Sequence, residues 1–196
     1  MRPATKKDTK NAVEIISKSF QTNPSILWVI KQDHKQRSRT RALALYSFRI
    51  ALLRRGAYLS DNGKGIALCY RSSSKRSLLA EYWNQVILVF RAIGIERVGI
   101  VLRRQAYIES IMPKNIEYLY FWFFGVEPGY NGRGGASEIK NALFEMSARE
   151  NLPIYLETSV EKNRRVYERY GFEVYHSWKV ENPDITLYFM RREPMN

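Results

Sequence analysis

Hydrophobic residues along this chain recur at two spacings, one typical of helices and one typical of strands. Helical spacing predicts a first helix that Asp8 or Thr9 can cap and that ends at Asn23-Pro24. A longer helix follows over residues 36–54. Two short strands come next, joined by an Asn-Gly dipeptide that is a strong hairpin signal, and they cover residues 57–60 and 65–71.

The stretch of residues 72–116 has the spacing of two consecutive helices. The apolar positions that mark them are Leu79, Tyr82, Trp83, Val86, Phe90 and Ile93, then Val98, Val101 and Leu102. Such an apolar stripe requires burial, so we expect these helices to pack against the rest of the molecule.

The second half of the chain alternates strands with helices and ends in two strands. Its elements are predicted at residues 117–126, 135–150, 153–157, 161–170, 172–180 and 184–191. A chain of 196 residues with 45% hydrophobic content can bury one proper core. We therefore expect a single α/β (α+β) domain over residues 1–196, with a mixed central sheet flanked by helices.

Asn131-Gly132-Arg133-Gly134-Gly135-Ala136 links the apolar strand to the next helix. Three glycines in four positions let the backbone approach a ligand closely, and the unpaired N–H groups of the following helix attract phosphate. A P-loop is excluded because no lysine follows the glycines, and a dinucleotide fingerprint fits less well because Ser137 replaces its third glycine. A simple strand-to-helix turn would need only one glycine. We interpret the segment as a phosphate cradle.

Val126-Glu127-Pro128 before the cradle and Asn163-x-x-x-Tyr167-x-x-Tyr170-Gly171-Phe172 after it resemble the GNAT family of acyl-CoA-dependent N-acyltransferases. The resemblance covers the C-terminal part of the chain well and the N-terminal part poorly. It departs from the family pattern at Asn131, where the family has Gln or Arg. The resemblance implies the GNAT fold, with residues 72–116 as a helical insertion between the third and fourth strands that covers the acceptor side of the cleft.

The same resemblance implies acetyl-CoA as co-substrate and no metal. The backbone of the cradle would surround the pyrophosphate, Arg133 and Arg164 would lie near the phosphates, and the end of the preceding strand would pair with the pantetheine arm. The residues expected to bind the co-substrate are Phe124, Gly125, Val126, Asn131, Gly132, Arg133, Gly134, Gly135, Ala136, Ser137, Asn163, Arg164 and Tyr167.

Acyl transfer from a thioester to an amine needs a neutral nucleophile, a stabilised oxyanion and a proton for the departing thiolate. The resemblance assigns the oxyanion to the backbone amide of Val126 and the proton to Tyr167. Tyr167 is alternatively a core tyrosine on a helix face, and Asn163 a helix cap. No metal-ligand spacing and no nucleophile triad is found in the sequence, which favours direct attack by the amine.

The sequence does not identify which residue acts as the general base. Some family members carry a glutamate base on the fourth strand. This chain has Tyr120 at the corresponding position. Three other glutamates in this part of the sequence are candidates for the base, and each also has a structural interpretation. They are Glu117, Glu127 and Glu157. We take Glu117 as the tentative base, because Glu127 is expected to point into the loop and Glu157 to satisfy a buried network.

Charge and composition add limits on partners. The formal net charge is +13, from 32 Lys and Arg against 19 Asp and Glu, which attracts anions. The basic residues are spread out and no nucleic-acid motif accompanies them, so nucleic-acid binding is expected to be absent or non-specific. No apolar run approaches a membrane span and no signal peptide is found, so we expect no membrane association and a cytoplasmic location. Cys69, the sole cysteine, is expected to be buried.

These observations predict an N-acetyltransferase that acts on a primary amine, with a small molecule slightly favoured over a protein amine. The alternative is a noncatalytic module that binds acyl-CoA or uses its basic surface to hold nucleic acid. Either a monomer or a homodimer is compatible with the sequence.

Overall fold

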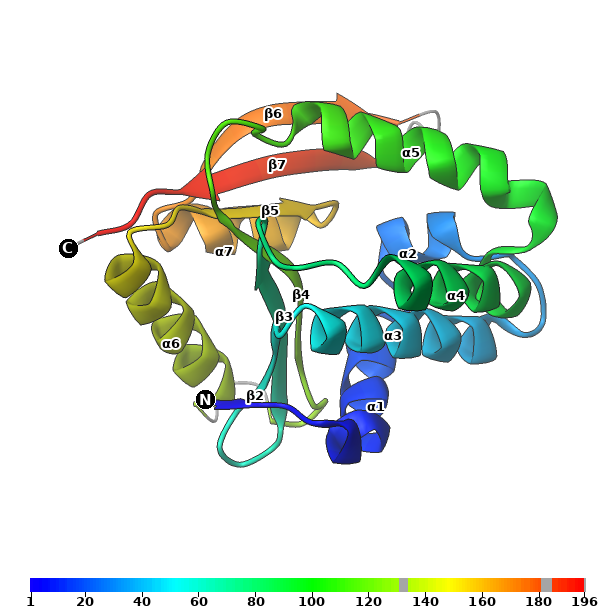
Figure 1. Cartoon of the computed structure of the whole chain (residues 1–196), viewed down its shortest axis with the longest axis horizontal. Coiled ribbons are helices and arrows are strands. Elements are labelled where there is room, and N and C mark those ends of the chain that lie inside the picture. The colour runs from blue at the N-terminus through cyan, green and yellow to red at the C-terminus, as the bar shows by residue number, and fades with distance from the viewer. Residues whose placement is uncertain (131–133, 181–184, 196) are drawn as a thin grey trace.

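The computed structural model describes residues 1–130, 134–180 and 185–195. Seven strands form one mixed sheet in the order β1-β2-β3-β4-β5-β7-β6 (Figure 1). The strands are β1 (Arg2–Pro3), β2 (Ala57–Leu59), β3 (Gly65–Arg71), β4 (Leu119–Val126), β5 (Ile154–Thr158), β6 (Glu173–Lys179) and β7 (Thr186–Arg192). The α-helices are α1 (Thr9–Ser19), α2 (Pro24–Val29), α3 (Gln36–Leu53), α4 (Leu78–Leu88), α5 (Val98–Ile111), α6 (Gly135–Glu150) and α7 (Glu161–Arg169).

Alternating residues of β3 send side chains into two different cores. Ile66 and Leu68 join the cluster formed with α1, α2 and α3, whereas Ala67 and Cys69 join the cluster formed with α6. Figure 1 shows α6 on the opposite side of the sheet from α1 and α3. The strand is buried on both faces because both are covered by helices, and this explains its nearly continuous apolar sequence. Cys69 is buried as predicted.

Strand β4 contains an irregularity opposite the junction of Leu68 and Cys69. Leu68 pairs with Phe123 while Cys69 pairs with Phe121, so Trp122 is an extra residue on β4. Trp122 and Phe123 consequently both pack on the cluster around α1 and α3, instead of alternating between faces. A β-bulge of this kind bends the strand and increases its twist.

The segment between β3 and β4 is helical, as predicted, but its packing differs from the prediction. Helix α4 leaves its apolar residues largely open to solvent: Leu79 is 88% exposed, Trp83 64% and Phe90, just beyond the helix, 67%. The segment is attached through Leu88, which is buried in the cluster with α1 and α3, and through Glu81, a 3% exposed residue whose carboxylate accepts bonds from Arg54 at 3.0 and 2.9 Å. The spacing of apolar residues predicted the helix correctly and its buried face incorrectly.

Helix α5 crosses over the far end of the sheet, alongside β7 and β6 (Figure 1). The ring of Tyr107 stacks on Trp178 of β6 with centroids 4.0 Å apart, and its hydroxyl is 2.9 Å from His176 Nε2. Ile108 and Met112 complete a third apolar cluster with β7. Helix α5 therefore covers an end of the sheet that α1 and α3 do not reach.

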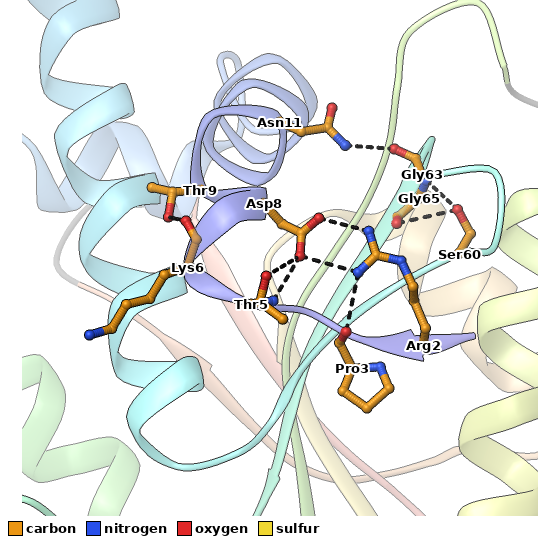
Figure 2. A network of polar contacts seen from close by, with 10 residues as sticks. All are labelled: Arg2, Pro3, Thr5, Lys6, Asp8, Thr9, Asn11, Ser60, Gly63 and Gly65. Atoms are coloured by element: carbon orange, nitrogen blue, oxygen red, sulfur yellow. Dashed lines mark hydrogen bonds and ion pairs between the residues drawn. The ribbon is translucent and has the colours of Figure 1, made fainter.

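A polar network holds the N-terminal segment against the hairpin of β2 and β3 (Figure 2). Arg2 donates to both carboxylate oxygens of Asp8, at 2.7 and 3.1 Å, and Asp8 also accepts the backbone N–H of Thr5. Asn11 of α1 donates to the carbonyl of Gly63 at 2.8 Å, in the predicted turn. The network fixes the start of α1 relative to the sheet.

Candidate functional site

The central strands β4 and β5 run parallel but remain paired over only two positions. Leu119 pairs with Ile154 and Tyr120 with Tyr155, while β5 continues to pair with β7 along its whole length. Beyond Tyr120 the two strands diverge, because β4 bends at its bulge and stays with β3. The divergence leaves the inner edges of β4 and β5 facing a gap in the middle of the sheet.

A cavity of about 1080 Å³ occupies this region and extends to both sides of β4. On one side it is lined by α6 and α7, through residues such as Ala136, Asn163 and Tyr167. On the other side it is lined by α3, α4 and α5 together with aromatic residues of β3 and β4. The helices of the segment 72–116 thus contribute walls to the cavity, as the sequence led us to expect.

The cradle predicted for phosphate leads into α6. Gly134 caps this helix with φ of 88°, in the left-handed region where glycine is favoured. Gly135, Ala136 and Ser137 form its first turn, and Ala136 lines the cavity. The predicted residues Asn131, Gly132 and Arg133 lie outside the described part of the chain. The N-terminal end of α6 therefore presents its unpaired N–H groups and positive dipole end beside the cavity.

Helix α7 brings two predicted residues to the cavity. Asn163 and Tyr167 both line it, one helical turn apart. The ring of Tyr167 lies against Phe121 and Phe172, with centroids 6.4 and 5.4 Å away. Its hydroxyl has no hydrogen-bond partner among the residues that the structure describes, and burial raises the pKa of Tyr167 to about 12. The phenol is thus protonated at neutral pH.

The structure does not bring Arg164 into the cavity. Its guanidinium bonds Glu161 at 2.9 and 2.5 Å and also contacts Glu168, both on its own helix. Arg165 bonds the same Glu161 at 3.2 Å. These helix-surface ion pairs occupy both arginines, so the predicted contact of Arg164 with phosphate finds no support in its position.

Glu117 also lies apart from the cavity. It precedes β4, and its carboxylate accepts a hydrogen bond from Ser73 at the exposed end of the sheet. Glu127 pairs with Lys64 at 2.7 Å beyond the other end of β4. Of the three glutamates considered from sequence, only Glu157 lines the cavity. Glu117 was preferred from sequence because Glu127 was expected to point into the loop and Glu157 to satisfy a buried network. The sequence does not reveal that the partner of Glu157 lies at the point where β4 and β5 separate.

Glu157 of β5 bonds Tyr120 of β4 across the point where the strands separate. The Tyr120 hydroxyl is 2.8 Å from each carboxylate oxygen. Burial raises the pKa of Glu157, and the positive charge of Arg104 on α5 partly opposes that increase. Burial and the neighbouring carboxylate also raise the pKa of Tyr120 well above its usual range. This pair is a buried ionisable centre at the middle of the cavity.

Aromatic rings surround this pair on the side of α3. Tyr70 of β3 meets Tyr120 edge-on at 5.5 Å and Trp122 at 6.1 Å, and Tyr46 of α3 meets Trp122 at 6.2 Å. The guanidinium of Arg54 lies 4.7 Å from the centre of the Tyr70 ring. This side of the cavity therefore combines aromatic rings with the side chains of Arg54, Arg76 and Arg104 around the carboxylate of Glu157.

Lys140 and Arg104 are among the cavity residues that the sequence analysis did not assign to the site. Lys140 follows Ala136 by one turn on α6 and lines the cavity, with its ammonium 5.0 Å from the ring of Tyr170. Its spacing of four from Ala136 is a signal that could have placed it on the same helix face. Arg104 lies in the helical insertion, and no local pattern distinguishes it from the neighbouring Arg103.

Comparison with known proteins supports the fold more strongly than the sequence does. No protein-family model matches the chain. A protein of Schizosaccharomyces pombe described as an uncharacterized N-acetyltransferase is 35% identical over 77 residues, which are 38% of this chain and 31% of that protein. The chain thus matches less than a third of the length of this relative.

Solved structures align over nearly the whole chain. A structure from Corynebacterium glutamicum, described as histone acetyltransferase HPA2 and related acetyltransferase, has a TM-score of 0.68 at 18% identity and covers 100% of this chain and 96% of its own. Arylalkylamine N-acetyltransferase 2 from Aedes aegypti has a TM-score of 0.64 at 13% identity, covering 99% and 98%. The NatC complex bound to Gag peptide and CoA has a TM-score of 0.56 at 15% identity, covering 100% and 97%.

These likenesses extend over nearly the whole chain and show its overall fold. Among the described residues, no helix is long and apolar enough to cross a membrane. The expectation drawn from the cradle and the Asn163/Tyr167 segment is confirmed: the chain has the fold of the GNAT acetyltransferases.

Proposed function

We propose that this protein transfers an acetyl group from acetyl-CoA to a primary amine by direct attack. The observation that carries the proposal is the cavity at the split between β4 and β5, which joins the N-terminal end of α6 to Tyr167 and to the Tyr120–Glu157 pair. A phosphate-attracting helix end, a protonated phenol and a buried carboxylate are the groups that acyl transfer to an amine requires. The similar structures described as acetyltransferases support the same chemistry.

The residues at the split fit a CoA thioester. Ala136 and Lys140 of α6 would face the phosphates, and the free edge of β4 would pair with the amide groups of pantetheine. Glu127 donates its N–H to the carbonyl of Lys64 on the β3 side at 2.8 Å. Successive amides of an extended strand point to opposite sides, so the amides of Val126 and Phe124 point toward the gap. This direction supports Val126 as the oxyanion donor.

The reaction can be written with its protons balanced. The ammonium loses one proton, and its nitrogen attacks the thioester carbonyl, forming a C–N bond while the oxyanion is held by the amide of Val126. Collapse breaks the C–S bond, and Tyr167 donates a proton to the departing thiolate. The second proton on nitrogen passes to solvent, from which Tyr167 is reprotonated. The products are an acetamide and CoA.

The wall of the cavity favours a small acceptor with an aromatic or aliphatic body. Tyr46, Tyr70 and Trp122 form an apolar surface on the acceptor side, and α4 and α5 pack around it. A peptide would present many backbone polar groups to these rings, and burying them without partners would cost free energy. The aromatic wall therefore supports a small amine over a protein amine.

A panel of primary amines with acetyl-CoA, scored by release of free thiol, tests the function. The panel should pair aromatic amines with aliphatic amines of similar size, and it should include peptides with a free N-terminus and with a lysine. We expect thiol release that depends on the amine and is greatest with the aromatic members. Thiol release limited to the peptides would contradict the small-acceptor proposal. No amine-dependent release with any member would contradict the enzyme proposal itself.

A further inference from the structure

Glu157 occupies a position that the sequence comparison with GNAT proteins does not assign. Where a glutamate base would stand on β4, this chain has Tyr120, and the carboxylate comes from β5 instead. The Tyr120 hydroxyl lies 2.8 Å from both carboxylate oxygens and so connects the two strands where they separate. The cavity therefore has a carboxylate where β4 and β5 separate, although the strand that would be expected to carry one does not.

We infer that Glu157 is the general base that deprotonates the amine, with Tyr120 as the residue that positions its carboxylate. The inference rests on the proposed acetyl transfer and names a catalytic residue for it. In this step the N–H bond of the ammonium breaks, its proton moves to a carboxylate oxygen of Glu157, and the electron pair left on nitrogen attacks the thioester. The proton on Glu157 passes to solvent after the acetamide leaves.

Geometry and hydrogen-bonding capacity support this role. Glu157 lines the same cavity as Val126 and Tyr167, so all three proposed groups face one continuous space. A carboxylate has about four lone-pair positions, and the single O–H of Tyr120 leaves acceptor capacity for an ammonium. In the described residues no ion pair holds Glu157, unlike Glu127 and Glu81, which are bonded to basic side chains. Glu109 also lines the cavity, but it is exposed and accepts a bond from Gln105, so Glu157 is the carboxylate at the strand split with capacity for a cationic ligand.

The surroundings also suit the protonation chemistry. Burial raises the pKa of Glu157, which brings a carboxylate base closer to the range in which it can accept and release a proton near neutral pH. The positive charge of Arg104 on α5 opposes part of this increase and so favours the ionised form. The ionisable groups that interact with Glu157 come from the strands and helix packed around it and are Arg104, Tyr70, Tyr118, Tyr120 and Tyr175.

Glu157→Gln tests the role, because the amide oxygen still accepts a bond from Tyr120 while the ability to take a proton is lost. With an amine that wild type acetylates, we expect kcat/KM near pH 7 to drop by about 10² to 10⁴, with acetyl-CoA affinity unchanged. The deficit should shrink as the pH approaches the pKa of the amine, about 10, because free amine then no longer needs a base. Glu145→Gln, on the exposed side of α6, is the matched control.

Tyr120→Phe provides a second and independent test. The hydrogen bond from Tyr120 lowers the pKa of Glu157, so its loss should raise that pKa. The acidic limb of the kcat/KM profile should therefore move to higher pH, which a merely structural tyrosine would not cause. This variant keeps the carboxylate and remains informative if Glu157→Gln fails to fold.

Three results would overturn the inference while leaving the proposed function intact. They are wild-type turnover in Glu157→Gln, a deficit in that variant that stays constant at every pH, and an acidic limb that does not move in Tyr120→Phe. Failure of the wild-type protein to acetylate any amine is a different result, because it contradicts acetyl transfer itself and not the assignment of Glu157 alone.

Discussion

At the scale of single residues, Tyr167 joins two properties that suit an acid. Its hydroxyl has no hydrogen-bond partner among the described residues, and burial raises its pKa to about 12. A buried phenol that is not bonded elsewhere can direct its proton to a ligand in the cavity that it lines. Phe121 and Phe172 hold its ring from two sides, so the hydroxyl is fixed by packing instead of by polar contacts.

Tyr167→Phe should preserve this packing and remove the proton source. We expect kcat to decrease by about 10² to 10⁴, the usual range for general acid catalysis, with little change in acetyl-CoA affinity. Tyr58→Phe is a suitable control, because Tyr58 lies on β2, away from the cavity. Its hydroxyl donates to the carbonyl of Arg55. Steady-state kinetics and a thermal melt of the variant together distinguish a catalytic Tyr167 from a purely structural one. Normal turnover with a lowered melting temperature would make Tyr167 a core residue only.

At the scale of elements, the sequence predicts the periodic segments well. Helices α3, α6 and α7 and the hairpin of β2 and β3 were predicted within one or two residues at each end, because each has a clear apolar period or a strong turn signal. The bulge at Trp122 was not predicted, since its run of aromatic residues gives no sign of which one is extra. The split of β4 from β5, and with it the central position of Glu157, depends on that bulge.

The spacing of apolar residues also did not predict how α4 packs against the rest of the molecule. The apolar stripe of α4 suggested burial of Trp83, whereas the structure buries Leu88 and the ion pair of Glu81 with Arg54 and leaves Trp83 exposed. A pattern of apolar residues shows that one face is distinctive and does not show what covers it. The same limit applies to the candidate site: Tyr167 was found by its motif, while Glu157 was considered but not preferred to Glu117.

The pair of Glu81 and Arg54 should contribute to the stability of α4. Removing one partner leaves the other charge largely buried and unpaired, so Glu81→Gln should destabilise the fold by about 3 kcal/mol, the low end of the range for breaking a buried pair. Burial alone would raise the pKa of Glu81, but hydrogen bonds from Arg54 and Arg76 outweigh it and the net shift is downward. A lowered pKa stabilises the fold above the unfolded value, about 4.3, and this contribution is lost as pH falls through the lower folded value.

Chemical denaturation of wild type and Glu81→Gln across pH measures this effect. The difference in unfolding free energy should be constant near neutral pH and should shrink as the pH falls below about 4. Glu14→Gln, which removes a solvent-exposed pair with Lys18, is the control and should have little effect. A difference that persists unchanged in acid would show that Glu81 does not act through its charge.

At the scale of the whole molecule, the net positive charge bears on which ligands the protein attracts. The net charge of +13 creates a field that attracts anions, and CoA carries several negative charges on its phosphates. Some of the basic side chains are paired locally: Arg164 and Arg165 bond Glu161, and Arg54 bonds Glu81. Lys140 is the described basic side chain that lines the cavity next to the first turn of α6. Weak, non-specific association with nucleic acid remains our prediction for the rest of the surface.

The central claim is that the split between β4 and β5 binds an acyl-CoA, and a crystal structure of the protein with CoA tests it most directly. We expect the pantetheine arm to lie along Phe124–Val126, the pyrophosphate to contact the first turn of α6, and the thiol to lie within hydrogen-bond reach of the Tyr167 hydroxyl, with Glu157 on the opposite side. CoA bound elsewhere on the basic surface, with the cavity between β4 and β5 empty, would contradict the account.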